Sequence, residues 1–254
     1  MKNLSKNMTL AAAVTLALAA FAGNAMAQEA ASAPAAEAVP DNVVSYNVAL
    51  TSDYRYRGVS QSRLKPAVSG GADYTNNPTG LYVGTWLSSI KWIKDGGGDT
   101  NFEWDVYGGK RGEFGNGFSY DVGGLYYFYP SNGLSTNANT FELYGQLGYG
   151  PAYIKYSHST TNLFGVADSK NSGYLDVGAN IDMNEGYILN LHVGRQKVEH
   201  NDSLSYNDYK LGVTKDFGVV TGSVAVVKAN ITSLAPNGKN LAKTGLVVSV
   251  SKTF

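Results

Sequence analysis

Hydrophobic and polar residues alternate along most of the chain, beginning near residue 43. Over 43–57 the even positions are mainly Val, Tyr and Leu, whereas the odd positions are mainly Ser, Asn, Asp and Arg. Successive side chains of a β-strand point to opposite faces, so this pattern predicts a strand with one apolar and one polar face. A half-buried strand of a soluble protein has the same period, so one such segment does not identify the fold.

The alternation recurs in further segments that cover most of the chain. Apolar residues occupy both phases in 81–92 and 219–229, which leaves the register of those two strands open. The pattern predicts an all-β fold, a transmembrane antiparallel up-and-down β-barrel of about 12 strands. The later segments begin near Val68, Leu81, Phe102, Tyr120, Phe141, Ala152, Leu175, Tyr187, Tyr209, Val219 and Leu246.

The segments between the predicted strands alternate in length. Long connections and tight turns on opposite sides are typical of a bacterial transmembrane barrel, whereas a soluble sandwich has no reason to separate them. We therefore expect longer extracellular loops and short periplasmic turns. The predicted loops cover 59–65, 95–100, 131–139, 160–172, 198–207 and 231–244, and the predicted turns cover 76–79, 111–117, 149–151, 184–186 and 216–218.

The first residues of the chain have the pattern of a cleavable targeting signal. Lys2 and Lys6 precede an apolar stretch over 8–22, and Ala25-Met26-Ala27 then fits a cleavage site. This order predicts a signal peptide over 1–27, and the short, alanine-rich apolar stretch disfavours a membrane anchor. Residues 28–42 are rich in Ala and Pro and predict a disordered lead-in, which leaves 43–254 as the barrel.

Aromatic residues near the predicted strand ends indicate two belts at the membrane interfaces. The predicted outer belt comprises Tyr54, Tyr56, Trp92, Phe102, Trp104, Phe128, Phe141 and Tyr156, and the predicted inner belt comprises Tyr46, Tyr74, Tyr82, Tyr120, Tyr187 and Phe254.

Composition excludes several classes of protein. The chain has 20 basic and 20 acidic residues, and removal of a signal peptide takes away two lysines, so the balance disfavours a nucleic-acid partner. It has no cysteine, which excludes disulfides and thiolate metal sites. After the signal peptide there is no apolar run long enough for a membrane-spanning helix.

Charged residues on the polar phase of the strands are expected to face a lumen, because a charge in the barrel wall is costly unless it faces water or a partner. Seven are acidic and four basic, which predicts a mild preference for cations unless Arg55 and Arg57 lie at the narrowest point. Salt bridges that plug a narrow barrel are the alternative. The predicted pore-lining residues are Asp53, Arg55, Arg57, Asp73, Glu103, Asp105, Asp121, Glu142, Lys155, Asp176 and Lys210.

Several segments resemble the TorF family of porin-like outer-membrane proteins. The resemblance is strongest over 47–62, which reads NVALTSDYRYRGVSQS, and it continues in 66–68, 80–89, 102–109 and 126–130. It implies an outer-membrane barrel with channel activity and transfers no catalytic residue. The alternating last strand, which ends at Phe254, is similar to the C-terminal signal that the barrel assembly machinery binds in such proteins.

The sequence thus predicts an outer-membrane channel for passive diffusion of ions or small hydrophilic solutes, with outer-membrane lipids and the assembly machinery as partners and no cofactor. His158, His192 and His200 have no metal-like spacing. Two alternatives stay open. One is an outer-membrane lipid or ester hydrolase that uses a Ser-His pair, for which His192 is the candidate base. The other is a structural or adhesive barrel without conductance.

Overall fold

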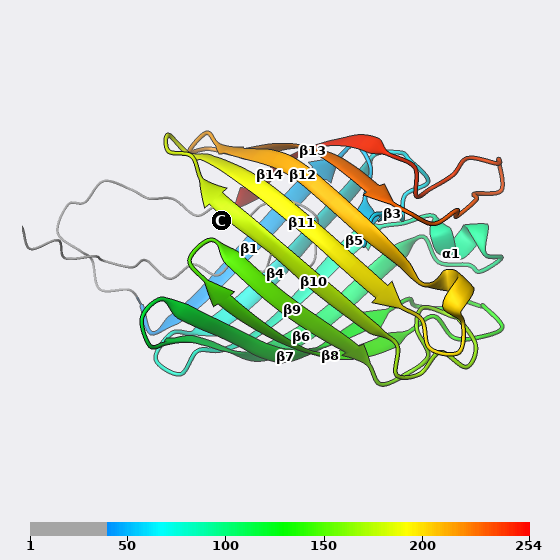
Figure 1. Ribbon diagram of the computed structural model, residues 1–254, viewed down its shortest axis with the longest axis horizontal. Coiled ribbons are helices and arrows are strands. Elements are labelled where there is room, and N and C mark those ends of the chain that lie inside the picture. The colour runs from blue at the N-terminus through cyan, green and yellow to red at the C-terminus, as the bar shows by residue number, and fades with distance from the viewer. Residues whose placement is uncertain (1–39) are drawn as a thin grey trace, which may run out of the picture.

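The computed structural model describes residues 40–254, and most of them belong to one closed antiparallel sheet of twelve strands (Figure 1). Each strand pairs with its neighbours in the chain, and β1 closes the barrel by pairing with both β4 and β14. This confirms the predicted all-β, up-and-down barrel. The strands are β1 (Asn42–Thr51), β4 (Ala67–Asn76), β5 (Leu81–Ser89), β6 (Phe102–Phe114), β7 (Phe118–Phe128), β8 (Thr140–Tyr149), β9 (Ala152–Ser159), β10 (Gly173–Asp182), β11 (Tyr187–Lys197), β12 (Tyr206–Asp216), β13 (Thr221–Ala229) and β14 (Gly245–Thr253).

The outer face of the barrel is apolar around its circumference. On β1, Val44, Tyr46, Val48 and Leu50 point outward and are 44–57% exposed, while the residues between them face the interior. A continuous apolar band on the outside of a closed sheet is typical of a transmembrane barrel. Among residues 40–254, no helix is long and apolar enough to span a bilayer.

The two rims of the barrel differ in loop length (Figure 1). Five short turns lie at one rim, which also holds both ends of the described chain, and six longer loops lie at the other rim. The turn between β10 and β11 shows how the chain reverses, because Asn184, Glu185 and Gly186 all have positive φ. The alternation of loop and turn lengths is the predicted one. We call these rims the short-turn end and the long-loop end.

Small elements within the long loops were not predicted. They are β2 (Arg55–Tyr56), β3 (Val59–Ser60), α1 (Trp92–Asp95) and the 3-10 helix η1 (Asp202–Leu204). The strands predicted over 43–57 and 81–92 were too long, because β1 ends at Thr51 and β5 ends at Ser89. Arg57 and Gly58 adopt positive φ and reverse the chain into the β2–β3 hairpin, which period-2 alternation does not reveal.

The predicted signal peptide, residues 1–27, lies outside the described residues, as does the predicted lead-in up to residue 39. Asn42, assigned to the lead-in, is the first residue of β1 and pairs with Asn76. The aromatic belts also need correction. Tyr54, Tyr56, Tyr82 and Trp92 turn inward or pack against the buried core, so they do not belong to a belt.

Tyrosines on the inner face lie over glycines of the neighbouring strand. Tyr144 pairs in register with Gly123, and Tyr153 pairs with Gly178. A methyl group on Gly123 would lie 2.6 Å from the Tyr144 hydroxyl and 2.5 Å from the Gly108 carbonyl oxygen. The glycines therefore let the rings lie flat against the wall, which keeps them from filling the interior.

We expect Gly123→Ala to destabilise the barrel by about 1–3 kcal/mol, because an added methyl group overpacks this site. Gly145→Ala is the matched control on the adjacent strand, since its nearest neighbour would be Val122 Cγ1 at 3.9 Å. Urea unfolding of both variants in detergent measures the difference. Equal stability of the two variants would show that the tyrosines do not need the glycines.

Candidate pore and the hairpin that narrows it

The first long loop, residues 52–66, folds into the barrel interior. We call this segment the lumen hairpin. Tyr54 packs edge-on against Trp86 of β5, with ring centroids 5.4 Å apart, and donates a hydrogen bond to Glu103 of β6. On the other side, a methyl group on Gly58 would lie 2.6 Å from the Cβ of Asp208 on β12. Because β5 and β12 belong to different walls, the hairpin spans the lumen near the long-loop end.

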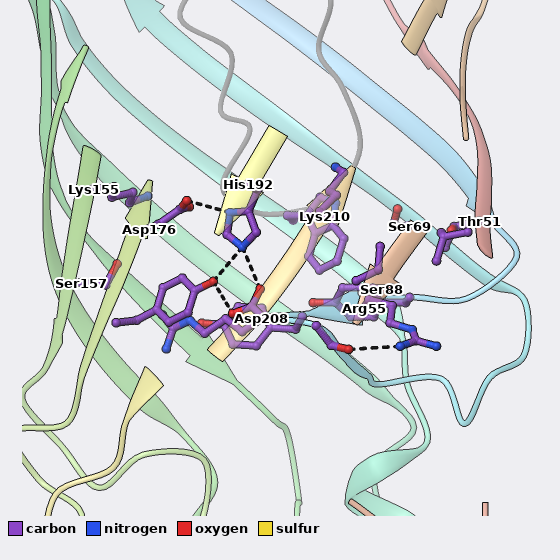
Figure 2. A pocket seen from close by; sticks show the side chains of 18 of the residues that line it. Thr51, Arg55, Ser69, Ser88, Lys155, Ser157, Asp176, His192, Asp208 and Lys210 are labelled. Atoms are coloured by element: carbon purple, nitrogen blue, oxygen red, sulfur yellow. Dashed lines mark hydrogen bonds and ion pairs between the residues drawn. The ribbon is translucent and has the colours of Figure 1, made fainter. Parts of the chain in front are cut away.

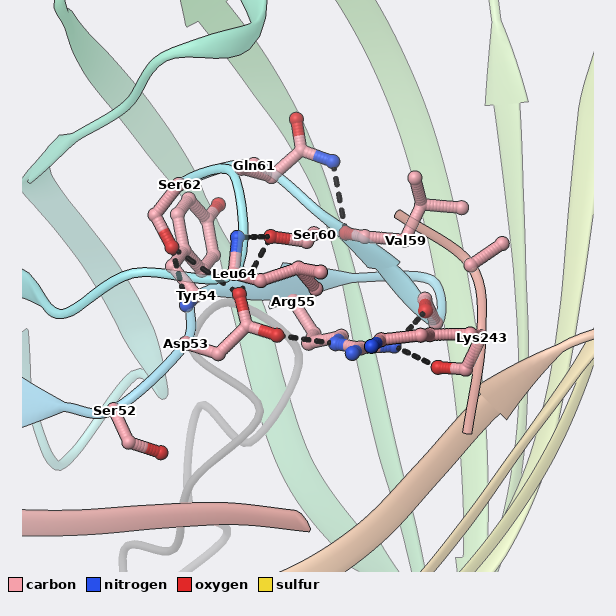
Figure 3. A network of polar contacts seen from close by, with 12 residues as sticks. Ser52, Asp53, Tyr54, Arg55, Val59, Ser60, Gln61, Ser62, Leu64 and Lys243 are labelled. Atoms are coloured by element: carbon pink, nitrogen blue, oxygen red, sulfur yellow. Dashed lines mark hydrogen bonds and ion pairs between the residues drawn. The ribbon is translucent and has the colours of Figure 1, made fainter. Parts of the chain in front are cut away.

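Polar contacts centred on Asp53 fix the shape of the hairpin (Figure 3). The Arg55 Nε donates to Asp53 at 2.6 Å, and the Ser60 and Ser62 hydroxyls donate to the same carboxylate at 2.5 and 3.2 Å. Arg55 also donates to the carbonyl oxygen of Lys243, in the loop before β14, at 2.8 Å. The hairpin is thus a preformed unit attached to the β13–β14 loop.

Arg57 attaches the tip of the hairpin to the opposite wall. Its guanidinium donates to both oxygens of Glu142 on β8, at 2.7 and 2.9 Å, and to Gln196 on β11 at 2.7 Å. It also lies 4.2 Å from the ring centroid of Tyr174. The side chains of Arg57 and Glu142 are 6% and 3% exposed, so this ion pair is largely withdrawn from water.

The alternation predicted that Asp53, Arg55 and Arg57 share one face of a wall strand, and this prediction is wrong. They lie in the hairpin after the end of β1, and the two arginines point to different parts of the barrel. The ion pair of Arg57 with Glu142 is a lumen salt bridge, the kind of contact that the sequence left open as the alternative.

The other predicted lumen charges lie on wall strands, and tyrosine hydroxyls engage several of the acids. Asp73 accepts a hydrogen bond from Tyr107 at 2.7 Å, and Asp121 accepts one from Tyr82 at 2.6 Å. Burial raises the pKa of the Tyr54 hydroxyl well above its ordinary value, and the adjacent Glu103 carboxylate raises it further, so Tyr54 stays a donor to Glu103. Asp105 is fully buried on the same face of β6 as Glu103.

A cluster around His192 lies on β10, β11 and β12 (Figure 2). Its Nδ1 is 2.7 Å from Asp176, and its Nε2 is 2.7 Å from Asp208. An ionised carboxylate only accepts hydrogen bonds, so the geometry is satisfied when both ring nitrogens carry a hydrogen. Tyr174 donates to the second oxygen of Asp208 at 2.8 Å.

Sequence reasoning missed Asp208 and Gln196. Asp208 lies two residues before Lys210 on the same face of β12, so extension of the predicted strand by one step would have found it. Gln196 lies near the end of β11, close to a predicted loop, and no sequence signal marks its contact with Arg57.

A cavity of about 140 Å³ lies in the lumen beside the lumen hairpin, and Figure 2 shows side chains that line it. Residues 53–58 of the hairpin line it, together with aromatic side chains of β5, β7 and β8 and the wall that carries His192. About 10–15 Å³ suffices for one water, so this space can hold several waters or a small solute. The described residues hold no cluster of three or more His, Asp or Glu side chains that could bind a metal.

Comparisons with known proteins agree with this architecture. A family model, Gcw_chp, described as a bacterial protein of unknown function, matches residues 35–254. No curated protein sequence matches. Among solved structures, the KdgM porin is similar with a TM-score of 0.52 and 8% identity, covering 83% of this chain and 97% of that one. The NanC porin is similar with a TM-score of 0.52 and 10% identity, covering 83% and 98%. At such identities the likeness shows the fold alone.

Proposed function

We propose that this chain, which belongs to the Gcw_chp family of bacterial proteins of unknown function, is a porin-like channel of the outer membrane for passive diffusion of ions or small hydrophilic solutes. The observation that carries the proposal is a closed barrel with an apolar outside and a charged lumen that contains a cavity. Twelve strands give a barrel between the filled eight-stranded kind and the wide porins. The fold shared with the KdgM and NanC porins supports this proposal.

Three finer expectations belong to the same proposal. The signal peptide over 1–27 would direct export, and the strand that ends at Phe254 would be bound by the barrel assembly machinery. In the structure this strand is β14, which pairs with β1 and so closes the barrel. Because β14 is the last strand of the chain, its pairing with β1 would complete the sheet. The resemblance to TorF porins is consistent with all of these, and each stays a prediction.

The surroundings of His192 favour a channel over a hydrolase. A catalytic pair needs a nucleophile within hydrogen-bond reach of the base. Among the described residues, the side chains that contact the His192 ring nitrogens are Asp176, Asp208 and Tyr174, and no serine is among them. We therefore propose that His192 organises charge on the lumen wall and that the protein is not an enzyme.

Purified full-length protein in planar lipid bilayers should give discrete conductance steps, because the lumen of each inserted barrel would connect the two sides of the membrane. Heat-denatured protein at the same concentration is the control and should give none. Cell fractionation should find the protein in the outer membrane, with a folded band that shifts on gels after heating. Folded protein that inserts into bilayers and never conducts would overturn the channel, as would recovery in the soluble periplasm.

A further inference from the structure

The charged residues on the outer face of the barrel wall are all basic. A side chain lies on this face when it shares the phase of the exposed apolar residues, as Arg195 does with Leu191 and Val193 on β11. By the same criterion, every Asp and Glu of the twelve barrel strands lies on the inner phase. The outward-facing charged residues of these strands are Lys110, Arg195, Lys197, Lys215, Lys228 and Lys252.

These bases are distributed differently at the two ends of the barrel. Lys110, Lys215 and Lys252 lie toward the short-turn end on β6, β12 and β14, and no two of these strands are neighbours. The other three lie toward the long-loop end and are confined to β11 and β13, which flank β12 on one side of the barrel (Figure 1). We call Arg195, Lys197 and Lys228 the outer basic patch.

Strand register sets the spacing within the patch. Arg195 pairs with Asn207 of β12, and Lys228 pairs with Tyr209 of the same strand. Neighbouring strands of a sheet lie about 4.8 Å apart, so β11 and β13 are about 10 Å apart across β12. Because Arg and Lys side chains are long and flexible, both charges can approach one large headgroup that lies over β12.

Two of the three charges have no acidic partner. Lys197 pairs with Glu199 at 2.8 Å, whereas no ion pair within residues 40–254 involves Arg195 or Lys228. The Arg195 guanidinium donates one hydrogen bond, to Asn207 Oδ1 at 3.3 Å, which leaves most of its five N–H donors for another acceptor. The patch therefore presents two outward cations without a counterion from the protein.

The patch adjoins an apolar surface on the same strands. Val193, Leu211 and Val226 are 45–55% exposed on the outer face, next to the patch and toward the middle of the barrel. Tyr209, beside Lys228, is 42% exposed, and tyrosine is enriched where a membrane meets water. The bases thus lie at headgroup level, and the apolar residues lie at the level of acyl chains. Bases that only reach for water would not require the absence of outward acids, so the charge pattern favours an anionic headgroup.

We propose that Arg195 and Lys228 bind the phosphate groups of a phosphorylated glycolipid in the outer leaflet, whose acyl chains lie on the apolar surface beside them. The guanidinium can bind a phosphate through two parallel hydrogen bonds, and the ammonium group acts as a point charge. Two cations about 10 Å apart suit a disaccharide that carries two phosphates better than the single phosphate of a glycerophospholipid. The inference rests on the proposed outer-membrane location, because it takes the long-loop end to lie in the outer leaflet.

Native mass spectrometry of the detergent-solubilised full-length protein, titrated with diphosphoryl lipid A, measures this binding. Arg195→Gln combined with Lys228→Gln should weaken the affinity about tenfold or more, because both phosphate contacts lose their charge. The matched control is Lys110→Gln with Lys252→Gln, which removes the same charge from the outer face at the short-turn end and should leave the affinity unchanged.

Three results would overturn the glycolipid site. The first is equal weakening in the two double variants, which would mean that only net charge matters. The second and third use the wild type alone: binding of a synthetic, phosphate-free lipid A, or of phosphatidic acid, as tight as that of diphosphoryl lipid A. These comparisons stay decisive even if a variant does not fold. Since no current is measured, failure of the site leaves the channel standing, and selective lipid binding by a barrel that never conducts supports the site and overturns the channel.

Discussion

Replacement of residues 52–66 by Asn-Gly is expected to raise the single-channel conductance several-fold. The hairpin lines the cavity and contacts both β5 and β12, so its removal widens the lumen at this height. Thr51 and Ala67 are register partners, and a tight Asn-Gly turn can therefore reconnect β1 and β4 without altering the barrel. Planar-bilayer recordings of both proteins in the same salt measure the effect.

The control is a shortening of the loop between β11 and β12, with residues 199–204 replaced by Asn-Gly. No residue of that segment borders the cavity, so its conductance should match the wild type. Heat-modifiability on gels confirms that both shortened barrels are folded. An unchanged conductance in the hairpin variant would show that the hairpin does not restrict the pore, and an equal rise in both variants would point to a general loosening of the long-loop end.

Glu142→Ala is expected to release the hairpin tip and turn a steady current into a fluctuating, larger one. Removal of one partner from a buried ion pair typically costs about 3–5 kcal/mol, because the other charge stays buried without its counterion. Arg57 can avoid much of this cost if the hairpin leaves its docked position and exposes the guanidinium to water. The expected loss is therefore in hairpin docking rather than in barrel stability, and single-channel current noise together with urea unfolding separates the two.

Two control variants test whether the Arg57–Glu142 ion pair causes this effect. Glu199→Ala removes the partner of Lys197 in an ion pair whose side chains are 60% and 29% exposed, and solvent screens such an exposed pair. It should change neither noise nor conductance. The exchange Arg57→Glu with Glu142→Arg should restore a quiet current if the ion pair itself holds the tip. If the current of Glu142→Ala is as quiet as that of the wild type, then Gln196 and the Tyr174 ring hold Arg57 without the carboxylate.

The barrel was readable from the sequence because lipid and water impose opposite demands on alternate residues. Leu50 and Val68 had to be apolar on the outside, whatever their partners, so each strand carried its own signal. The alternation of loop lengths was the second signal for the barrel. It could be seen in the sequence because each loop joins strands that are neighbours in the chain. Strands 81–89 and 221–229 were ambiguous for a physical reason: Trp86, Ala225 and Val227 are buried on the inner face, which made both phases apolar.

The lumen depended on contacts that no local pattern contains. Alternation placed Asp53, Arg55 and Arg57 on a strand. Only the structure shows where the hairpin docks, because Arg57 is held by Glu142 and Gln196, which lie 85 and 139 residues away from it in the chain. The same holds for the charge of the cavity. The sequence determined which residues face inward, since that follows from the two-residue period of each strand. The tertiary structure decided which of those charges border the cavity, since that follows from how the strands align around the barrel and where the hairpin crosses it.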